Sequence, residues 1–202
     1  MKLRLGFLAS HGGSNVQAIL DACRERRLDA EPCVVISNNS DAMVLDRAMA
    51  ARVPAFHLSS HTHPDPARLD DVILATLEKH RVNLIVLAGY MKKLGPQTLA
   101  RYHGRVLNMH PALLPKFGGR GMYGHHVHEA VLAAGEKESG ATVHLADAEY
   151  DTGRILAQRR VPVRADDTSE SLAARVLEVE HQLYAETLQR IARGEIKLEG
   201  LR

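Results

Sequence analysis

Asn108 and His110 are the residues whose types and spacing most directly suggest chemistry, since an amide and an imidazole stand two residues apart at the end of an apolar segment. Residues i and i+2 of an extended segment point to the same side, so the two polar ends are expected together. Pro111 then stops the segment. The carboxyl end of a strand is where open α/β sheets place their ligands. The pair therefore predicts a ligand site, and a strand end with merely hydrogen-bonded side chains is an equally supported alternative.

Asp151 and His144 are further candidates. Asp151 lies in a predicted turn, 149–153, where a carboxylate could act as a general acid or base or orient an imidazole. An Asp before Thr-Gly is, by itself, more often a turn-forming residue. His144 alternates with Thr142 in a predicted strand, and a hydrogen-bonded core histidine is the default interpretation there.

The turn 10–15, Ser-His-Gly-Gly-Ser-Asn, joins the first predicted strand to the first predicted helix. Glycines let the backbone approach a ligand closely, and the start of a helix offers free N–H groups to an anion. A phosphate is therefore the expected ligand, although the segment matches neither the P-loop nor the GxGxxG pattern. A tight turn with Ser14 as a plain N-cap is about as well supported.

Glu180 shares a helical face with the apolar residues Val176 and Tyr184, so its carboxylate needs a partner. A cationic ligand is one candidate, and a nearby arginine is the more usual one. The twelve histidines include the cluster His125, His126 and His128. Because no second cluster follows at zinc-ligand spacing and HExxH is absent, we expect no metal site.

The composition bounds the class of protein. The chain has 202 residues, 45% of them hydrophobic and 25% charged, which indicates a single globular domain. A formal net charge of +2 gives no support for a nucleic-acid partner, and no apolar run is long enough to span a membrane. The two cysteines, Cys23 and Cys33, form no CxxC pair. These features predict a soluble, cytoplasmic protein.

Short apolar runs alternate with amphipathic helical patterns through the first 110 residues, with strands predicted at 3–9, 33–37, 55–58, 84–89 and 105–110. Asp41 and Asp65 are expected to cap two of the intervening helices. This alternation predicts an α/β fold with a doubly wound, mostly parallel sheet. Two later strands, 140–147 and 155–163, are expected to extend it in antiparallel fashion, followed by a long C-terminal helix over 169–192.

Taken together, Gly13-Ser14-Asn15, the segment 108–115 (Asn-Met-His-Pro-Ala-Leu-Leu-Pro), and His144 with Asp151 resemble the folate-dependent formyltransferase family. The resemblance covers nearly the whole chain in order, and the Gly-Ser-Asn turn is typical of the purine-biosynthetic branch. It implies one Rossmann-like catalytic domain over 1–202, with a nucleotide-binding half (1–110) and a folate-binding, catalytic half (111–202).

The chemistry that this resemblance implies is a direct transfer between two small molecules. The amine of glycinamide ribonucleotide would attack the formyl carbon of 10-formyltetrahydrofolate, which serves as a co-substrate, and no bound cofactor is needed. Asn108 would donate a hydrogen bond to the resulting oxyanion, and protonated His110 would stabilise it electrostatically. Asp151 would set the ionisation of His110 and assist proton transfer.

The resemblance also implies which residues bind the two substrates. The ribonucleotide would be bound by Gly13, Ser14, Asn15 and Glu180, so for Glu180 a ligand now outranks an arginine. Folate contacts are expected at Met91, Lys92, Lys93, Leu94, Asn108, His144 and Ala146. The chain departs from many members in a longer loop, 118–126, and in Lys92-Lys93, where an Arg and an apolar residue are common.

Other functions within the family are less consistent with this chain. Methionyl-tRNA and sugar-nucleotide formyltransferases would carry extra domains, and a 10-formyltetrahydrofolate hydrolase would carry an N-terminal regulatory domain. A non-catalytic nucleotide- or folate-binding module is the alternative from another class. It would need none of Asn108, His110 and Asp151. We expect small-molecule partners only, in a monomer or homodimer.

Overall fold

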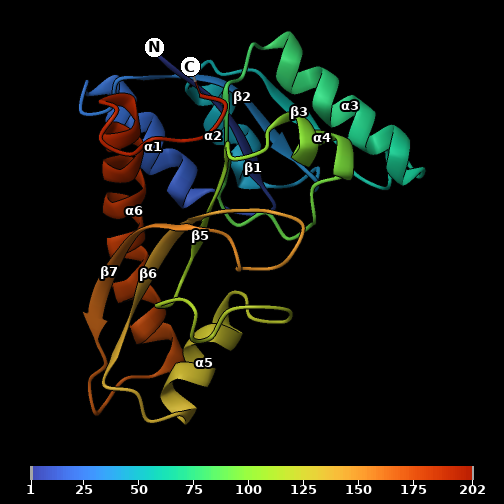
Figure 1. Cartoon of the computed structure of the whole chain (residues 1–202). Helices are drawn as coiled ribbons and strands as arrows, with labels where there is room; N and C mark the ends of the chain where they lie inside the picture. Colours follow the sequence, from blue (N-terminus) through green and yellow to red (C-terminus); the bar gives the residue numbers. More distant parts are fainter. Residues whose placement is uncertain (1, 202) are drawn as a thin grey trace.

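The sheet is built around β1 (Leu3–Ala9) and β4 (Leu84–Leu87), which are nearly continuous apolar runs because both faces of these strands are covered. The computed structural model describes residues 2–201 (Figure 1), and its strand order is β3-β2-β1-β4-β5-β6-β7. Strands β1 to β5 pair in parallel, whereas β6 and β7 are antiparallel. The predicted doubly wound sheet with an antiparallel extension is confirmed. The remaining strands are β2 (Ala30–Ser37), β3 (Ala55–His57), β5 (Val106–His110), β6 (Glu138–Leu145) and β7 (Ile155–Pro162).

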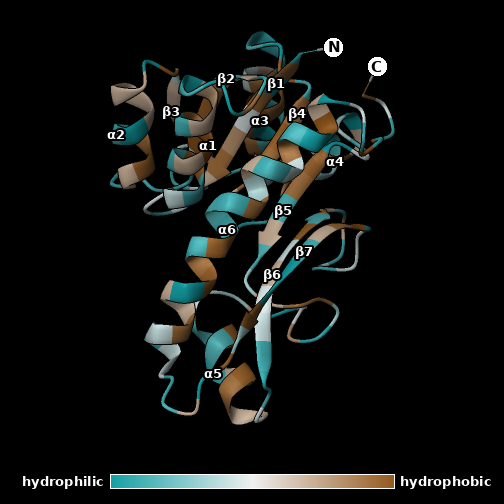
Figure 2. Ribbon diagram, turned by 90° about the vertical axis from the view of Figure 1, so that its left-hand side faces the viewer, coloured by the Kyte–Doolittle hydropathy of each residue, from teal (hydrophilic) through white to brown (hydrophobic). Residues whose placement is uncertain are grey.

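Helices cover both faces of the parallel part of the sheet. The helices are α1 (Ser14–Arg24), α2 (Met43–Ala50), α3 (Pro66–Lys79), α4 (Pro96–Arg101), α5 (His125–Ala133) and α6 (Ser169–Ala192), of which α5 packs on α6 near the antiparallel strands. One apolar cluster joins the sheet to α1, α2 and α6, and a second joins the opposite face to α3. Figure 2 shows the apolar strands between these helix layers.

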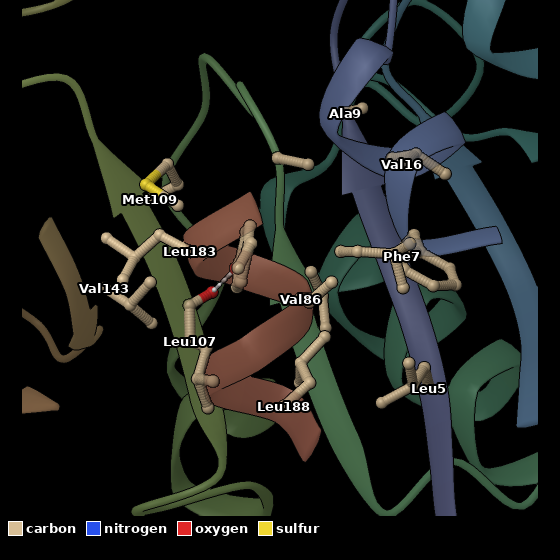
Figure 3. Packing of buried hydrophobic residues seen from close by; sticks show 14 of the residues in the cluster. Leu5, Phe7, Ala9, Val16, Val86, Leu107, Met109, Val143, Leu183 and Leu188 are labelled. Atoms are coloured by element: carbon tan, nitrogen blue, oxygen red, sulfur yellow. Dashed lines mark hydrogen bonds between the residues drawn. The ribbon is translucent and has the colours of Figure 1, made fainter. Parts of the chain in front are cut away.

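The long helix α6 anchors the second half of the chain to the first. Thr168 and Ser171 form a reciprocal capping box that fixes its start. Leu183 and Leu188 of α6 pack against the central strands (Figure 3), and both are nearly fully buried. The Tyr184 hydroxyl lies 2.9 Å from the carbonyl oxygen of Leu87 and 3.1 Å from that of Leu107, so α6 is tied to both β4 and β5.

Several element boundaries differ from the sequence prediction. Asp65 does cap α3, through a hydrogen bond to the Ala67 N–H, but α2 begins after Ala42, so the predicted Asp41 cap is wrong. Strand β2 begins at Ala30 because it pairs with β1 over the full length of that strand. Strand β6 runs from Glu138 to Leu145 because of its pairing with β7. Glu138 is opposite Pro162 at the end of β7, and His144 is opposite Ile155 at its start.

The sheet topology determines where a ligand can bind. Chain connections run from β1 outward to β3 and then return to β4 on the other side of β1, so the order of strands reverses between β1 and β4. Open α/β sheets bind ligands outside the carboxyl ends of the strands at such a reversal. No helix within residues 2–201 is both long and apolar enough to cross a membrane.

Candidate active site

Asn108 and His110 lie on one face of β5 at its carboxyl end, as the spacing predicts. In the antiparallel pairing with β6, Asn108 is opposite His144 and His110 is opposite Thr142. The Asn108 Nδ2 atom lies 3.1 Å from the His144 Nε2 atom. The two strands therefore bring an amide and two imidazoles together near the sheet reversal.

His110 is 3% exposed and is held by groups on both sides of its ring. Its Nε2 lies 2.7 Å from the carbonyl oxygen of Phe117, so Nε2 carries a proton and donates it. Its Nδ1 lies 3.6 Å from the Asp151 Oδ2. Burial lowers the pKa of His110, although the Asp151 charge and the Phe117 hydrogen bond oppose this effect. The ring is therefore neutral near pH 7 in the free protein, in contrast to the protonated His110 that the resemblance implies. Its Nδ1 is available to take a proton beside a carboxylate.

Asp151 both forms a turn and faces the histidines, so its two sequence interpretations are compatible. Its backbone is in the left-handed region, with φ 58°. Its Oδ2 accepts a 2.8 Å hydrogen bond from the Gly119 N–H, and its Oδ1 lies 3.5 Å from the His144 Nε2. Burial alone raises the pKa of Asp151, but the adjacent His144 imidazole, the hydrogen bond from the Gly119 N–H and the positive charge that His110 can carry lower it overall. Asp151 is therefore an ionised carboxylate at rest.

The turn before α1 presents backbone donors at the carboxyl end of β1. Gly13 is the N-cap residue, with φ 66°, and a side chain there would collide with Val44 of α2. Ser14 is the first residue of α1, so its interpretation as the N-cap is wrong. The first N–H groups of a helix have no intrahelical partner, and here they follow directly from Gly13. The segment can therefore receive an anion.

Glu180 meets Asn15 across the long sequence separation between α6 and α1. The Asn15 Nδ2 donates a 2.7 Å hydrogen bond to the Glu180 Oε2, so an asparagine takes the place of the arginine considered from sequence. Burial raises the pKa of Glu180 to about 7, although the Asn15 hydrogen bond opposes the shift. The Asn15 Oδ1 is buried without a partner in the described structure. This pair retains unused hydrogen-bonding capacity.

One cavity of about 850 Å³ brings most of these residues together. Its wall includes Gly13, Ser14 and Asn15 at the start of α1 and Glu180 of α6 beside them, together with Asn108, His110 and Asp151. Met91 and Lys92 line it after β4, and the loop 119–125 forms a further wall. Its volume lies within the range of small-molecule sites.

Four expected folate contacts lie outside the cavity wall among residues 2–201: Lys93, Leu94, His144 and Ala146. Leu94 is buried in the second apolar cluster, and His144 is 1% exposed behind Asn108. The Lys93 Nζ donates a 2.9 Å hydrogen bond to the Ala148 carbonyl and lies 4.4 Å from the centre of the Tyr150 ring. Lys93 therefore contacts the turn that carries Asp151.

Sequence reasoning missed two features of the site. The glycine-rich loop supplies backbone groups to the central residues, through the Phe117 carbonyl and the Gly119 N–H. His128 of α5 also lines the cavity and is 4% exposed, with an unpartnered Nδ1. Burial, with the charges of His125 and His110, lowers its pKa. The clustering of histidines at 125–128 is the signal in the sequence, but it predicts neither the burial of His128 nor its position on the cavity wall.

Comparisons with known proteins agree with this geometry. The formyl transferase family model matches residues 3–188. The chloroplastic phosphoribosylglycinamide formyltransferase of Vigna unguiculata is 41% identical over 96% of this chain, which spans 62% of that protein. The phosphoribosylglycinamide formyltransferase of Haemophilus influenzae is 37% identical, with 97% of this chain and 90% of that protein covered.

Solved structures give the same result. Glycinamide ribonucleotide transformylase 1 from Symbiobacterium toebii superposes with a TM-score of 0.91 at 39% identity, covering 100% of this chain and 92% of that one. A formyltetrahydrofolate deformylase from Pseudomonas syringae reaches 0.86 at 25% identity, covering 100% of this chain and 65% of that one. The chain belongs to the formyl transferase family.

Proposed function

We propose that this protein transfers the formyl group of 10-formyltetrahydrofolate to the amine of N1-(5-phospho-D-ribosyl)glycinamide. The products are formylglycinamide ribonucleotide and tetrahydrofolate, and the reaction serves de novo purine biosynthesis. The observation that carries the proposal is the convergence of Asn108, His110 and Asp151 on a cavity that also contains the start of α1. Relatives named phosphoribosylglycinamide formyltransferase match nearly the whole chain.

The ribonucleotide is proposed to bind at the α1 side of the cavity. Its phosphate is received by the backbone at Gly13, Ser14 and Asn15, where a helix start favours an anion. Glu180 then holds the amino end, because an ionised carboxylate beside the Asn15 amide is a partner for an amine. This arrangement directs the amine toward Asn108 and His110 on the same cavity wall.

The folate is proposed to bind on the β4 side, against Met91 and Lys92. Met91 and Tyr150 are half-exposed apolar surfaces on the cavity wall, and both suit an aromatic ligand. Direct contacts with the folate are not supported for Lys93, Leu94, His144 and Ala146, because these residues do not line the cavity. We propose that Lys93 and His144 act on the folate site through the residues they touch, Tyr150 and Asn108.

The reaction needs no covalent intermediate with the protein. The neutral amine nitrogen forms a bond to the formyl carbon, and the electron pair of the carbonyl moves to oxygen. The Asn108 amide has two protons, of which one faces His144, so the other can donate to this oxyanion. The amine then loses a proton, which ionised Asp151 accepts directly or through water. The oxyanion re-forms the formyl C=O as the bond from that carbon to the folate nitrogen breaks, and the folate nitrogen receives the proton.

A formyltetrahydrofolate hydrolase is the second candidate, because a deformylase shares this fold. Water would then replace the amine, and the sites at Glu180 and Gly13 would have no substrate group to bind. The deciding experiment is consumption of 10-formyltetrahydrofolate by the purified protein with and without the ribonucleotide. Consumption that requires the ribonucleotide supports the transferase. Formate release without any amine would identify a hydrolase, and no consumption would favour another acceptor or a binding module.

The remaining properties are proposals of the same kind. We propose one catalytic domain over 1–202, no resident cofactor or metal, and a monomer or homodimer. A cytoplasmic location is proposed from the two free cysteines, Cys23 and Cys33. Plant relatives are named chloroplastic, so the compartment differs among relatives.

A further inference from the structure

Arg47 of α2 lies behind the turn that is proposed to receive the phosphate. Its Nε donates a 2.7 Å hydrogen bond to the Gly12 carbonyl, and its Nη1 lies 3.3 Å from the Gln17 Oε1 of α1. Its Nη2 lies 3.5 Å from the Met43 sulfur. Among the described residues, Arg47 is not part of the cavity wall. Its effect on a ligand must therefore pass through the turn or through its charge.

The hydrogen bond to Gly12 fixes the orientation of a donor in the turn. In a trans peptide the C=O and the following N–H point in opposite directions. Because Arg47 holds the Gly12 carbonyl on the α2 side, the Gly13 N–H points away from α2. Gly13 itself lines the cavity. The guanidinium thus selects the peptide orientation that offers this N–H to a ligand.

Helix α2 is locked against the turn at two further points. The Val44 N–H donates a 3.2 Å hydrogen bond to the His11 carbonyl. Val44 also occupies the space that a side chain at Gly13 would need. Arg47 therefore belongs to a rigid contact between α2 and the turn, and the turn cannot rotate without breaking it.

The charge of Arg47 also reaches the α1 side of the cavity. It contributes, after burial, to the lowered pKa of His181, which neighbours Glu180 on α6. Lys92 and Arg120 are the lysine and arginine on the described cavity wall, and neither is on α1, α2 or the turn 10–13. If a phosphate dianion bound at Gly13, Arg47 would be the arginine that is hydrogen-bonded to the turn holding the phosphate.

We propose that Arg47 is a positioning residue for the phosphate of the ribonucleotide, which holds the Gly12–Gly13 peptide in its anion-binding orientation and adds positive charge behind it. This inference rests on the proposed function, because it presumes a phosphorylated substrate. It extends the phosphate site from the turn itself to a side chain on a different helix. Arg47 touches no reacting atom.

The test compares Arg47→Gln, Arg47→Lys and a control, Arg68→Gln, whose side chain is 71% exposed on α3. Steady-state kinetics with both substrates are measured for each variant, together with calorimetric titration by ribose 5-phosphate. Arg47→Gln is expected to raise the KM for the ribonucleotide on the order of 10-fold, as for loss of a charged hydrogen bond. The KM for the folate and kcat should stay unchanged, and ribose 5-phosphate should bind correspondingly weaker. Arg47→Lys should recover only part of the loss, since lysine cannot bridge Gly12 and Gln17.

Three outcomes would overturn the inference. They are equal increases in both KM values, a lower Tm with unchanged affinity for ribose 5-phosphate, and full recovery by Arg47→Lys, which would reduce the effect to charge alone. Failure of the proposed function looks different, since the unaltered protein would then not formylate the ribonucleotide. In that case the titration with ribose 5-phosphate still decides whether Arg47 supports a phosphate site.

Discussion

The His144 Nε2 lies 3.1 Å from the Asn108 Nδ2, directly across the pairing of β5 and β6. The His144 Nδ1 lies 2.8 Å from the Leu145 carbonyl, which places a proton on Nδ1 and leaves Nε2 as the acceptor. Asn108 therefore donates one amide proton to His144 and keeps the other for a ligand. His144 acts on the reaction through Asn108, without reaching the cavity.

Replacement of His144 by Phe is expected to lower kcat on the order of 10-fold, because the Asn108 amide loses the bond that orients it toward the oxyanion. The KM for the ribonucleotide should not change. Removal of the amide itself, in Asn108→Ala, should cost on the order of 100-fold or more. The double variant should be no slower than Asn108→Ala alone. Losses that multiply would show that His144 acts independently of Asn108.

Asp151→Asn is expected to abolish turnover while both substrates still bind, because an amide cannot accept the proton that leaves the amine. Single-turnover kinetics would measure the chemical step, and equilibrium titration would measure binding. Asp147→Asn is a matched control, since Asp147 is exposed in the same connection between β6 and β7. Near-normal turnover in Asp151→Asn would exclude its role in proton transfer.

Local pattern was sufficient for much of the fold and for the central residues. The alternation of apolar and polar residues predicted the order of strands and helices, because burial on one or both faces determines that pattern directly. The spacing of Asn108 and His110 placed them on one strand face, and the pairing in the structure confirms it. The hydrogen bond from His110 to the Phe117 carbonyl could not be predicted in this way, since the path of a loop brings Phe117 to the ring.

Contacts between segments that are distant in the sequence were the main features that local pattern did not predict. Glu180 and Asn15 meet because α6 packs on α1, and no local pattern encodes that pairing. Local pattern does not predict the role of Arg47 either, since its hydrogen bond to the Gly12 carbonyl joins the last turn of α2 to the turn before α1. Asp41 was predicted to cap a helix from its residue type alone. In the structure α2 begins at Met43, where the next residue, Val44, hydrogen-bonds to His11 in the turn before α1.

Lys93→Met is expected to raise the KM for the folate several-fold and to leave the KM for the ribonucleotide unchanged, because the turn with Tyr150 loses its attachment to the β4 side. Lys93→Arg should retain most of the affinity. Lys79→Met, at an exposed position on α3, is the control. Folates with one and with several glutamates would separate two roles for Lys93. A loss that grows with tail length would show that Lys93 binds the tail directly.

Glu180 should make the stability of the protein depend on pH. Burial raises its pKa from 4.5 to about 7, so between these values the folded state keeps a proton that the unfolded state has released. Its contribution to stability is present below pH 4.5 and is lost as the pH rises to about 7. Relative to Glu180→Gln, the unaltered protein should lose about 3 kcal/mol across this window. Urea unfolding of both proteins between pH 5 and pH 8 measures the difference, and parallel pH curves would contradict it.

The same ionisation should control binding of the ribonucleotide. Below pH 7 the Glu180 carboxyl is protonated and cannot pair with an amine as a charged partner, so the KM for the ribonucleotide should rise as the pH falls through about 7. The KM for the folate should not follow this trend, because Glu180 lies beside Asn15 on the α1 side of the cavity. In Glu180→Gln the KM for the ribonucleotide should be high at every pH and should lose this component of its pH dependence. A variant that keeps the full pH dependence would assign it to the substrate amine or phosphate instead of to Glu180.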